Sequence, residues 1–170
     1  HMNYQYSMSQ GWPAPDLDEK AFAKSDWIVC VSESARSALN DFFPEVTSKI
    51  KIIPNRVSEA IIKRQAEESV EHNAESPEVY NVVTVARLVE EKGIWEALEA
   101  CKILVERGIR IRWDWIGDGS ERRRLNERIK DFGLERCFYL LGEKANPYPY
   151  MKNATVYVQP SRTEAHCVAV

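Results

Sequence analysis

Residues 80–93 read Tyr-Asn-Val-Val-Thr-Val-Ala-Arg-Leu-Val-Glu-Glu-Lys-Gly, and the pattern changes halfway along this stretch. The first half is an apolar run rich in β-branched residues, which is typical of a strand covered on both faces of a parallel sheet. From Ile94 to Val105 the apolar residues follow helical spacing instead, and charged residues fill the opposite side. The sequence therefore predicts a strand, a loop and a helix that begins just after Gly93.

The loop between this strand and helix contains two cations, Arg87 and Lys92, five residues apart. Fixed cations at the carboxyl end of a parallel strand, beside a helix N-terminus, form a natural site for a diphosphate. The alternative is that both are solvated charges of a surface loop.

The same alternation of strand, loop and helix follows three more times, with strands expected at residues 110–116, 138–141 and 155–159. The loops after them contain Gly117-Asp118-Gly119, Gly142 and Pro160-Ser161. We expect the Gly-x-Gly turn to let the backbone approach a ligand; the alternative is an ordinary tight turn, because the full dinucleotide fingerprint is absent. The alternation predicts an α/β fold with an open, Rossmann-like, doubly wound parallel sheet whose ligand binds across the carboxyl ends of the strands.

Two finer details follow from local pattern in this region. Arg112 and Asp114 alternate with Trp113 and Trp115, which is the pattern of a strand whose polar side chains lie on one face. Ser120 stands where the N-cap of the next helix is expected.

The chain divides by composition into three parts. Residues 1–56 are expected to hold a cloning scar (His1 and Met2) and the end of one domain, with a strand at 26–31, a helix at 33–43 and a strand at 50–53. Residues 57–78 are acidic and poor in large apolar residues, and we expect a linker with one helix there. Residues 79–170 then form the main domain.

Composition excludes several classes of function. The chain has 170 residues, and its 23 basic and 26 acidic residues give a net charge of -3. Because no basic stripe interleaved with aromatic residues is present, we expect no nucleic-acid partner. Four scattered cysteines without metal-ligand spacing predict buried thiols in a reducing compartment and no zinc site. No apolar run reaches the length of a membrane span.

Four segments then carry a resemblance to a known family. They are residues 85–93, 116–119, 141–142 and 159–164, which read Val-Ala-Arg-Leu-Val-Glu-Glu-Lys-Gly, Ile-Gly-Asp-Gly, Leu-Gly and Gln-Pro-Ser-Arg-Thr-Glu. Their order and spacing resemble the donor-binding domain of the group 1 retaining glycosyltransferases, which have the two-domain GT-B fold. Residues 146–153 resemble bacterial members that build capsular and other surface polysaccharides. Residues 25–32 and 49–55 resemble the last two strands of the family's acceptor domain.

The resemblance assigns a role to each matching residue. Arg87 and Lys92 would hold the donor diphosphate and compensate the charge that grows on the leaving nucleotide. Glu164 would contact the donor sugar, which makes these three the catalytic candidates. The donor-binding candidates are Gly117, Gly119, Glu143, Lys144, Ser161 and His166. Of these, Glu143 and Lys144 would border the nucleobase, and His166 would lie near the phosphates. No metal and no other cofactor is implied.

The implied activity is transfer of a sugar from a nucleotide-diphosphate sugar, carried most readily on UDP, to a saccharide acceptor with retention. Such a reaction would serve bacterial polysaccharide or glycan synthesis in the cytoplasm, with peripheral association of the full protein at the inner face of the membrane. Two alternatives remain open. One is a non-catalytic nucleotide- or protein-binding Rossmann-like module, and the other is a GT-B sugar-nucleotide epimerase.

The sequence also departs from the family pattern. The second glutamate of the paired-glutamate motif would fall at position 172, beyond Val170. Residue 165 is alanine where the family usually has glycine, and residues 55–58 read Asn-Arg-Val-Ser where Asn-Gly-Val-Asp is frequent. We therefore expect an incomplete donor domain and a fragment that binds donor at most and does not turn it over. An unfinished sheet with an exposed edge would also favour self-association.

Overall fold

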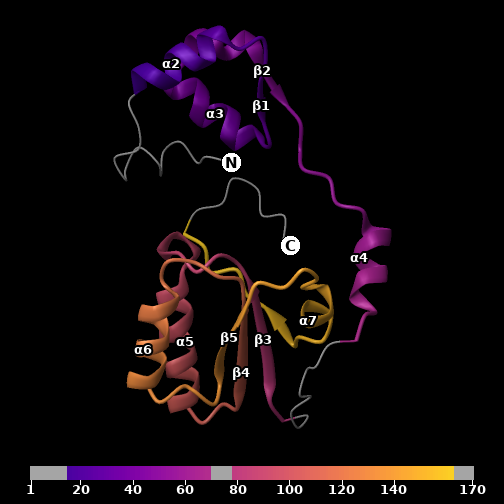
Figure 1. The fold of residues 1–170 in the computed structure, drawn as a ribbon, viewed down its shortest axis with the longest axis vertical. Coiled ribbons are helices and arrows are strands. Elements are labelled where there is room, and N and C mark those ends of the chain that lie inside the picture. The colour runs from indigo at the N-terminus through magenta and orange to yellow at the C-terminus, as the bar shows by residue number, and fades with distance from the viewer. Residues whose placement is uncertain (1–14, 70–77, 163–170) are drawn as a thin grey trace. The chain divides into compact units, whose positions relative to one another are not determined.

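The computed structural model describes residues 15–69 and 78–162 (Figure 1). These residues form two compact units with a boundary after residue 57. The first unit is described over residues 15–57, and the second over residues 58–69 and 78–162.

The first unit places helices against a small parallel sheet. Its elements are α2 (Pro15–Lys24), β1 (Ile28–Cys30), α3 (Glu33–Phe42), the 3-10 helix η1 (Pro44–Lys49) and β2 (Ile50–Ile52). β1 and β2 pair in parallel, with Ile28 opposite Ile50. Ser32 caps α3, because its hydroxyl accepts the backbone N–H of Ala35 at 3.2 Å. The strand, helix and strand predicted from residues 26–53 are therefore present.

The second unit is built on the predicted parallel sheet. Its strands are β3 (Tyr80–Val85), β4 (Ile111–Ile116), β5 (Phe138–Gly142) and β6 (Val156–Tyr157). They lie in the order β5-β4-β3-β6, and every pair is parallel. β4 and β3 are thus the two inner strands, and β3 has a neighbour on each side. This confirms the predicted α/β class with an open parallel sheet.

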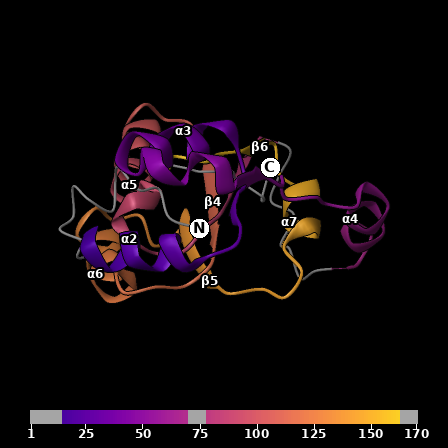
Figure 2. The same ribbon diagram turned by 90° about the horizontal axis from the view of Figure 1, so that it is seen from above.

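Helices cover both faces of this sheet, which confirms the doubly wound arrangement. α5 (Ile94–Glu106) and α6 (Arg122–Asp131) lie on one side of the strands, and α7 (Tyr148–Lys152) lies on the other (Figure 1, Figure 2). The main core lies under α5 and α6 and includes Leu98, Trp115 and Leu125, none of them more than 1% exposed. A smaller core of Val83, Ile116 and Tyr150 lies under α7.

The helix expected in residues 57–78 is α4 (Glu59–Ala66), and it contacts α7. The Asn146 side-chain amide donates to the carbonyl of Gln65 at 2.8 Å, and the Lys152 ammonium lies 2.6 Å from the carboxylate of Glu67. Helix α4 is therefore attached to the second unit.

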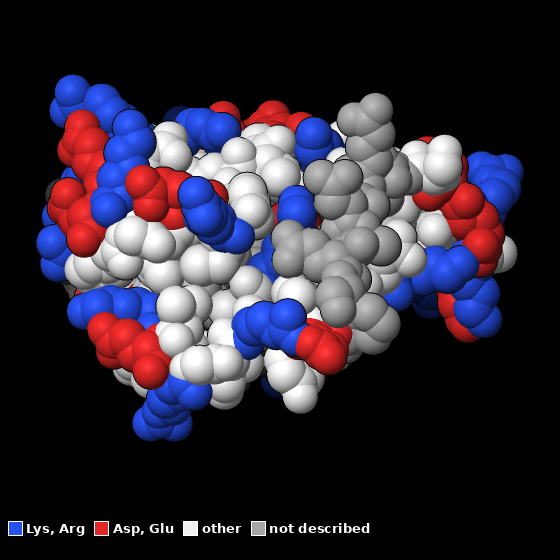
Figure 3. Space-filling view, turned by 90° about the horizontal axis from the view of Figure 1, so that it is seen from below, with Lys and Arg blue, Asp and Glu red and all other residues white. Residues whose placement is uncertain are grey.

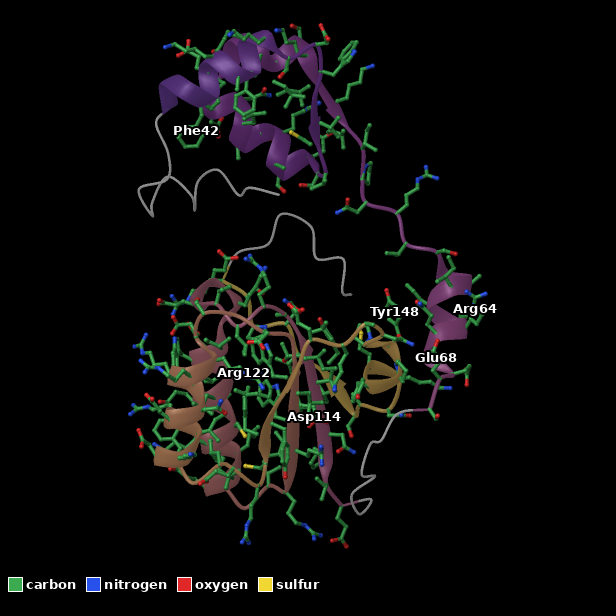
Figure 4. All side chains as sticks on the ribbon, in the orientation of Figure 1. Phe42, Arg64, Glu68, Asp114, Arg122 and Tyr148 are labelled. Atoms are coloured by element: carbon green, nitrogen blue, oxygen red, sulfur yellow. The ribbon has the colours of Figure 1, made fainter. Side chains whose placement is uncertain are left out.

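The predicted alternation at residues 110–116 falls on strand β4, and its polar residue Asp114 is buried. Asp114 is 1% exposed, and Figure 4 labels it among the strands of the sheet. The Nε of Arg112 donates to its two carboxylate oxygens at 3.0 and 3.2 Å, and the Arg112 guanidinium lies 4.4 Å from the centre of the Tyr139 ring. Alternation along one strand predicts a solvated face only if nothing packs on it, and here both faces are covered. The buried charge is accepted because it is paired and hydrogen-bonded.

Three cysteines fall within the described residues, and each is a free thiol. Cys30 and Cys101 are buried, and Cys137 is half-buried. Burial raises the pKa of the Cys101 thiol to about 12, and the neighbouring Cys137 adds to the effect. The prediction of buried thiols is thus confirmed for Cys30 and Cys101, while Cys167 lies outside the described residues.

The charges of the second unit are mixed. On the face shown in Figure 3, basic and acidic side chains are interspersed among the described residues. Within residues 15–69 and 78–162, no helix combines the length and the apolar character that crossing a bilayer requires.

Candidate functional site

The four loops that follow the strands of the second unit meet at one edge of the sheet, because parallel strands end on the same side. Backbone hydrogen bonds tie neighbouring loops together. Leu88 N–H donates to the carbonyl of Asp118 at 2.9 Å, and Gly117 N–H donates to the carbonyl of Gly142 at 2.8 Å. Arg162 N–H donates to the carbonyl of Glu91 at 3.0 Å. Segments more than 70 residues apart in sequence therefore share one edge.

Arg87 and Lys92 lie in the loop that follows the central strand β3. Lys92 is the last residue of the 3-10 helix η2 (Glu90–Lys92) and is half-buried. Gly93 follows and is the N-cap of α5, so both cations lie close to the N-terminus of that helix. The Arg87 side chain is 67% exposed, and its Nη2 lies 2.7 Å from the Oε1 of Glu91. A diphosphate placed here would meet two cations and the positive end of the helix dipole.

The glycines of the Gly-x-Gly turn pack against the β3 loop. At Gly117, where φ is +136°, a Cβ atom would lie 2.1 Å from the carbonyl oxygen of Ala86. At Gly119 a Cβ atom would lie 2.4 Å from the carbonyl oxygen of Leu88. The close approach in the structure is between two loops of the protein, and it brings the end of β4 against the loop that holds Arg87 and Lys92. Close approach of the backbone to a ligand at this turn stays a prediction.

The remaining candidates lie at the same edge or outside the described residues. The Ser161 hydroxyl follows β6 and accepts a hydrogen bond from the Gln159 amide at 2.8 Å. Glu143 and Lys144 follow β5 and are exposed. Glu164 and His166 lie outside the described residues.

Sequence reasoning missed a cluster that joins the β6 loop to the start of α5. This Arg162 cluster consists of Arg162, Glu90 and Glu96. The guanidinium Nε lies 2.7 Å from Oε1 of Glu96, and Nη1 lies 3.2 Å from Oε1 of Glu90. The partners are 66 and 72 residues apart, so no local spacing could have indicated them.

Arg122 is a second cation that the motifs did not indicate, and Figure 4 labels it. It extends from α6 toward the strand ends, where Nη2 donates to the carbonyl of Leu140 at 3.0 Å. Its Nη1 lies 3.4 Å from the carboxylate of Asp118. Arg122 therefore ties α6 to strand β5 and to the loop after β4.

The Arg162 cluster should make stability depend on pH. Burial alone would raise the pKa of the Glu96 carboxyl, but a hydrogen bond from its own backbone N–H, with the hydrogen bond and charge of Arg162, lowers that pKa below the ordinary value of 4.5. A carboxyl with a lowered folded-state pKa stabilises the fold above its unfolded pKa, and this contribution is lost as the pH falls through the folded pKa. As the pH is lowered from about 6 to about 3, we expect the thermal unfolding midpoint to fall more for the wild type than for Glu96→Gln. Parallel curves for the two proteins would contradict this role.

A hollow of about 520 Å³ lies between α5 and α6. Trp95, Phe132 and several charged side chains line it, and neither Arg87 nor Lys92 is among them. Glu90 of the Arg162 cluster also lines the hollow, which otherwise belongs to the surface of α5 and α6.

Comparison with known proteins identifies the family of this chain. The family model described as "Glycosyl transferases group 1" matches residues 65–170, which is more than half of the chain. All four loops at the sheet edge fall within the match.

Two curated relatives and one solved structure are similar to the chain. An uncharacterized glycosyltransferase of Methanocaldococcus jannaschii is 26% identical over 87% of this chain and 37% of its own length. The amylovoran biosynthesis glycosyltransferase AmsK of Erwinia amylovora is 37% identical over 49% of this chain and 21% of its own length. A crystal structure of the G117R mutant of Staphylococcus aureus TarM, in complex with Fondaparinux, alpha-GlcNAc-glycerol and UDP, is 21% identical with a TM-score of 0.72. That match covers 99% of this chain and 32% of TarM. The chain thus spans between a fifth and two fifths of the length of these proteins.

Proposed function

The chain belongs to the group 1 glycosyl transferases, and from this membership we propose that the protein transfers a sugar from a nucleotide-diphosphate sugar to a saccharide acceptor with retention of configuration. We propose UDP as the nucleotide, and the TarM structure solved with UDP supports this choice. The acceptor proposal is supported by the relative that is named for amylovoran biosynthesis.

One observation carries the proposal. Arg87 and Lys92 lie at the carboxyl end of the central strand, beside the N-terminus of α5, and the loops of β4 and β6 border them. In open α/β sheets, ligands bind at this edge. When the glycosidic bond of the donor breaks, negative charge develops on the leaving diphosphate, and two cations and a helix N-terminus would stabilise it.

The other residues have supporting roles in this proposal. Glu164 would contact the donor sugar, and Ser161 would border it from the β6 loop. Glu143 and Lys144 would border the base. The reaction would need no metal, because the protein itself supplies the positive charge opposite the diphosphate.

Calorimetric titration with UDP, GDP and ADP tests the proposal. We expect UDP to bind, and we expect Arg87→Ala and Lys92→Ala each to weaken binding by about 1.5 to 3 kcal/mol, or roughly ten- to a hundredfold, because a charged hydrogen bond is lost. Arg107→Ala is the matched control, since it removes an exposed cation just past the opposite end of α5.

Equal affinity in all four proteins would contradict the diphosphate role of Arg87 and Lys92. That result would favour the non-catalytic binding module, which requires neither cation. Stronger binding of GDP or ADP than of UDP would correct the choice of nucleotide.

Peripheral association of the full protein with a membrane and self-association through sheet edges stay predictions. Among the described residues of the second unit, β5 and β6 are the edge strands, and Val156 of β6 is 46% exposed. Unpaired edges of this kind favour strand pairing between chains.

A further inference from the structure

Arg87 is already paired with a carboxylate in the structure, before any diphosphate is considered. Its Nη2 lies 2.7 Å from Oε1 of Glu91. A guanidinium binds carboxylates and phosphates through the same planar set of N–H donors. The two anions therefore compete for one group.

The two partners differ in their freedom to move. The Arg87 side chain is 67% exposed, whereas the Glu91 side chain is 27% exposed. The Glu91 backbone is also held from the β6 loop, because its carbonyl accepts the N–H of Arg162 at 3.0 Å. Arg87 is thus the partner that can turn toward a ligand, and Glu91 is the partner that stays.

We propose that Glu91 competes with the donor diphosphate for Arg87. Glu91 binds the Arg87 guanidinium when the site is empty and releases it when a diphosphate binds. This inference rests on the proposed function. Each binding event then has to break the Arg87–Glu91 ion pair and brings the diphosphate near the released carboxylate. Both effects lower the affinity for diphosphates.

The adjacent glutamate supplies a matched control. Glu90 lies in the same 3-10 helix, but its carboxylate lies 3.2 Å from the guanidinium of Arg162. Glu90→Gln therefore removes one negative charge from the same loop and leaves the Arg87–Glu91 pair intact. A comparison of the two variants separates the ion pair from the general effect of charge.

The experiment is a titration of UDP into the wild type and four variants at low ionic strength: Glu91→Gln, Glu90→Gln, Arg87→Ala and the double variant Arg87→Ala with Glu91→Gln. Circular dichroism first checks that each variant is folded. We expect Glu91→Gln to bind UDP about two- to fivefold more tightly, the range that an exposed ion pair allows. The gain should exceed that of Glu90→Gln, should shrink at high salt, and should vanish in the Arg87→Ala background.

Three results would overturn the inference. Unchanged or weaker binding by Glu91→Gln, with Arg87→Ala still impaired, would reject the competition while the proposed function stands. An equal gain in Glu90→Gln, or a gain that persists without Arg87, would assign the effect to general charge. Absence of UDP binding in all five proteins would overturn both proposals.

Discussion

Gly93→Ala should lower the free energy of unfolding of the second unit by at least about 3 kcal/mol. Gly93 has a φ of +69°, a left-handed conformation that costs an L-residue about 1 to 2 kcal/mol. A Cβ atom here would also lie 2.1 Å from the carbonyl oxygen of Pro160. Since a Cβ atom is fixed to its own backbone and the Pro160 carbonyl is backbone, relief requires the β6 loop to move away from the start of α5. Urea unfolding followed by circular dichroism measures the loss.

Gly108→Ala is the control for this prediction. Gly108 has a φ of +75°, but a Cβ atom there would meet nothing within 4 Å. Only the conformational strain remains, so we expect a loss of about 1 to 2 kcal/mol. Equal losses of unfolding free energy in the two variants would mean that the collision with Pro160 does not contribute to the destabilisation.

Trp115→Ala should cost about 3 to 5 kcal/mol, the range found for removal of a large buried aromatic side chain. Trp115 is 0% exposed, and its ring lies 6.5 Å from that of Phe138 between centroids. Its indole N–H also donates to the carbonyl of Ala86 at 2.9 Å, so the substitution leaves a cavity and an unpaired acceptor beside the Arg87 loop. The same urea titration measures the effect.

Tyr80→Ala is the matched control for Trp115→Ala. Tyr80 is an aromatic residue on the neighbouring strand β3, but it is 55% exposed. We expect a loss below about 1 kcal/mol, since little apolar area leaves the core. A comparable loss of unfolding free energy from both substitutions would contradict the prediction that the burial of Trp115 under α5 and α6 accounts for its larger effect.

The fold was predictable where local pattern and tertiary packing agree. The β-branched run at the start of residues 80–93 and the helical spacing after it both require a strand and a helix covered on their apolar sides, and β3 and α5 form there. The edge strand was predicted at residues 155–159, but β6 is limited to Val156–Tyr157. Edge strands have one neighbour, so sequence pattern constrains their ends poorly.

One local prediction, the N-cap of α6, failed because backbone carbonyls satisfied the first amides of the helix. Ser120 does not cap α6, which has Glu121 at its N-cap without a side-chain hydrogen bond. The first amides are satisfied by carbonyls instead: Glu121 N–H donates to Leu88 at 3.1 Å, and Arg122 N–H to Gly119 at 3.2 Å.

The candidate site was predictable in position and less so in its internal contacts. The loop motifs located Arg87, Lys92 and Ser161 at one edge of the sheet, since parallel strands bring their carboxyl ends together. The pairing of Arg87 with Glu91 and the Arg162 cluster depend on side-chain directions and on contacts between distant loops. Such contacts have no signature in the spacing of residues along the chain.

The hydrogen bonds between the strand-end loops determine which substitutions these loops can tolerate. The bonds that join Leu88 to Asp118, Gly117 to Gly142 and Arg162 to Glu91 all run between backbone groups. A substitution that keeps the backbone conformation therefore leaves these bonds in place, whichever side chain it introduces. Outside the glycine contacts, the loops of this chain can therefore exchange side chains, and hence the ligands they accept, while the backbone frame that holds them together stays in place.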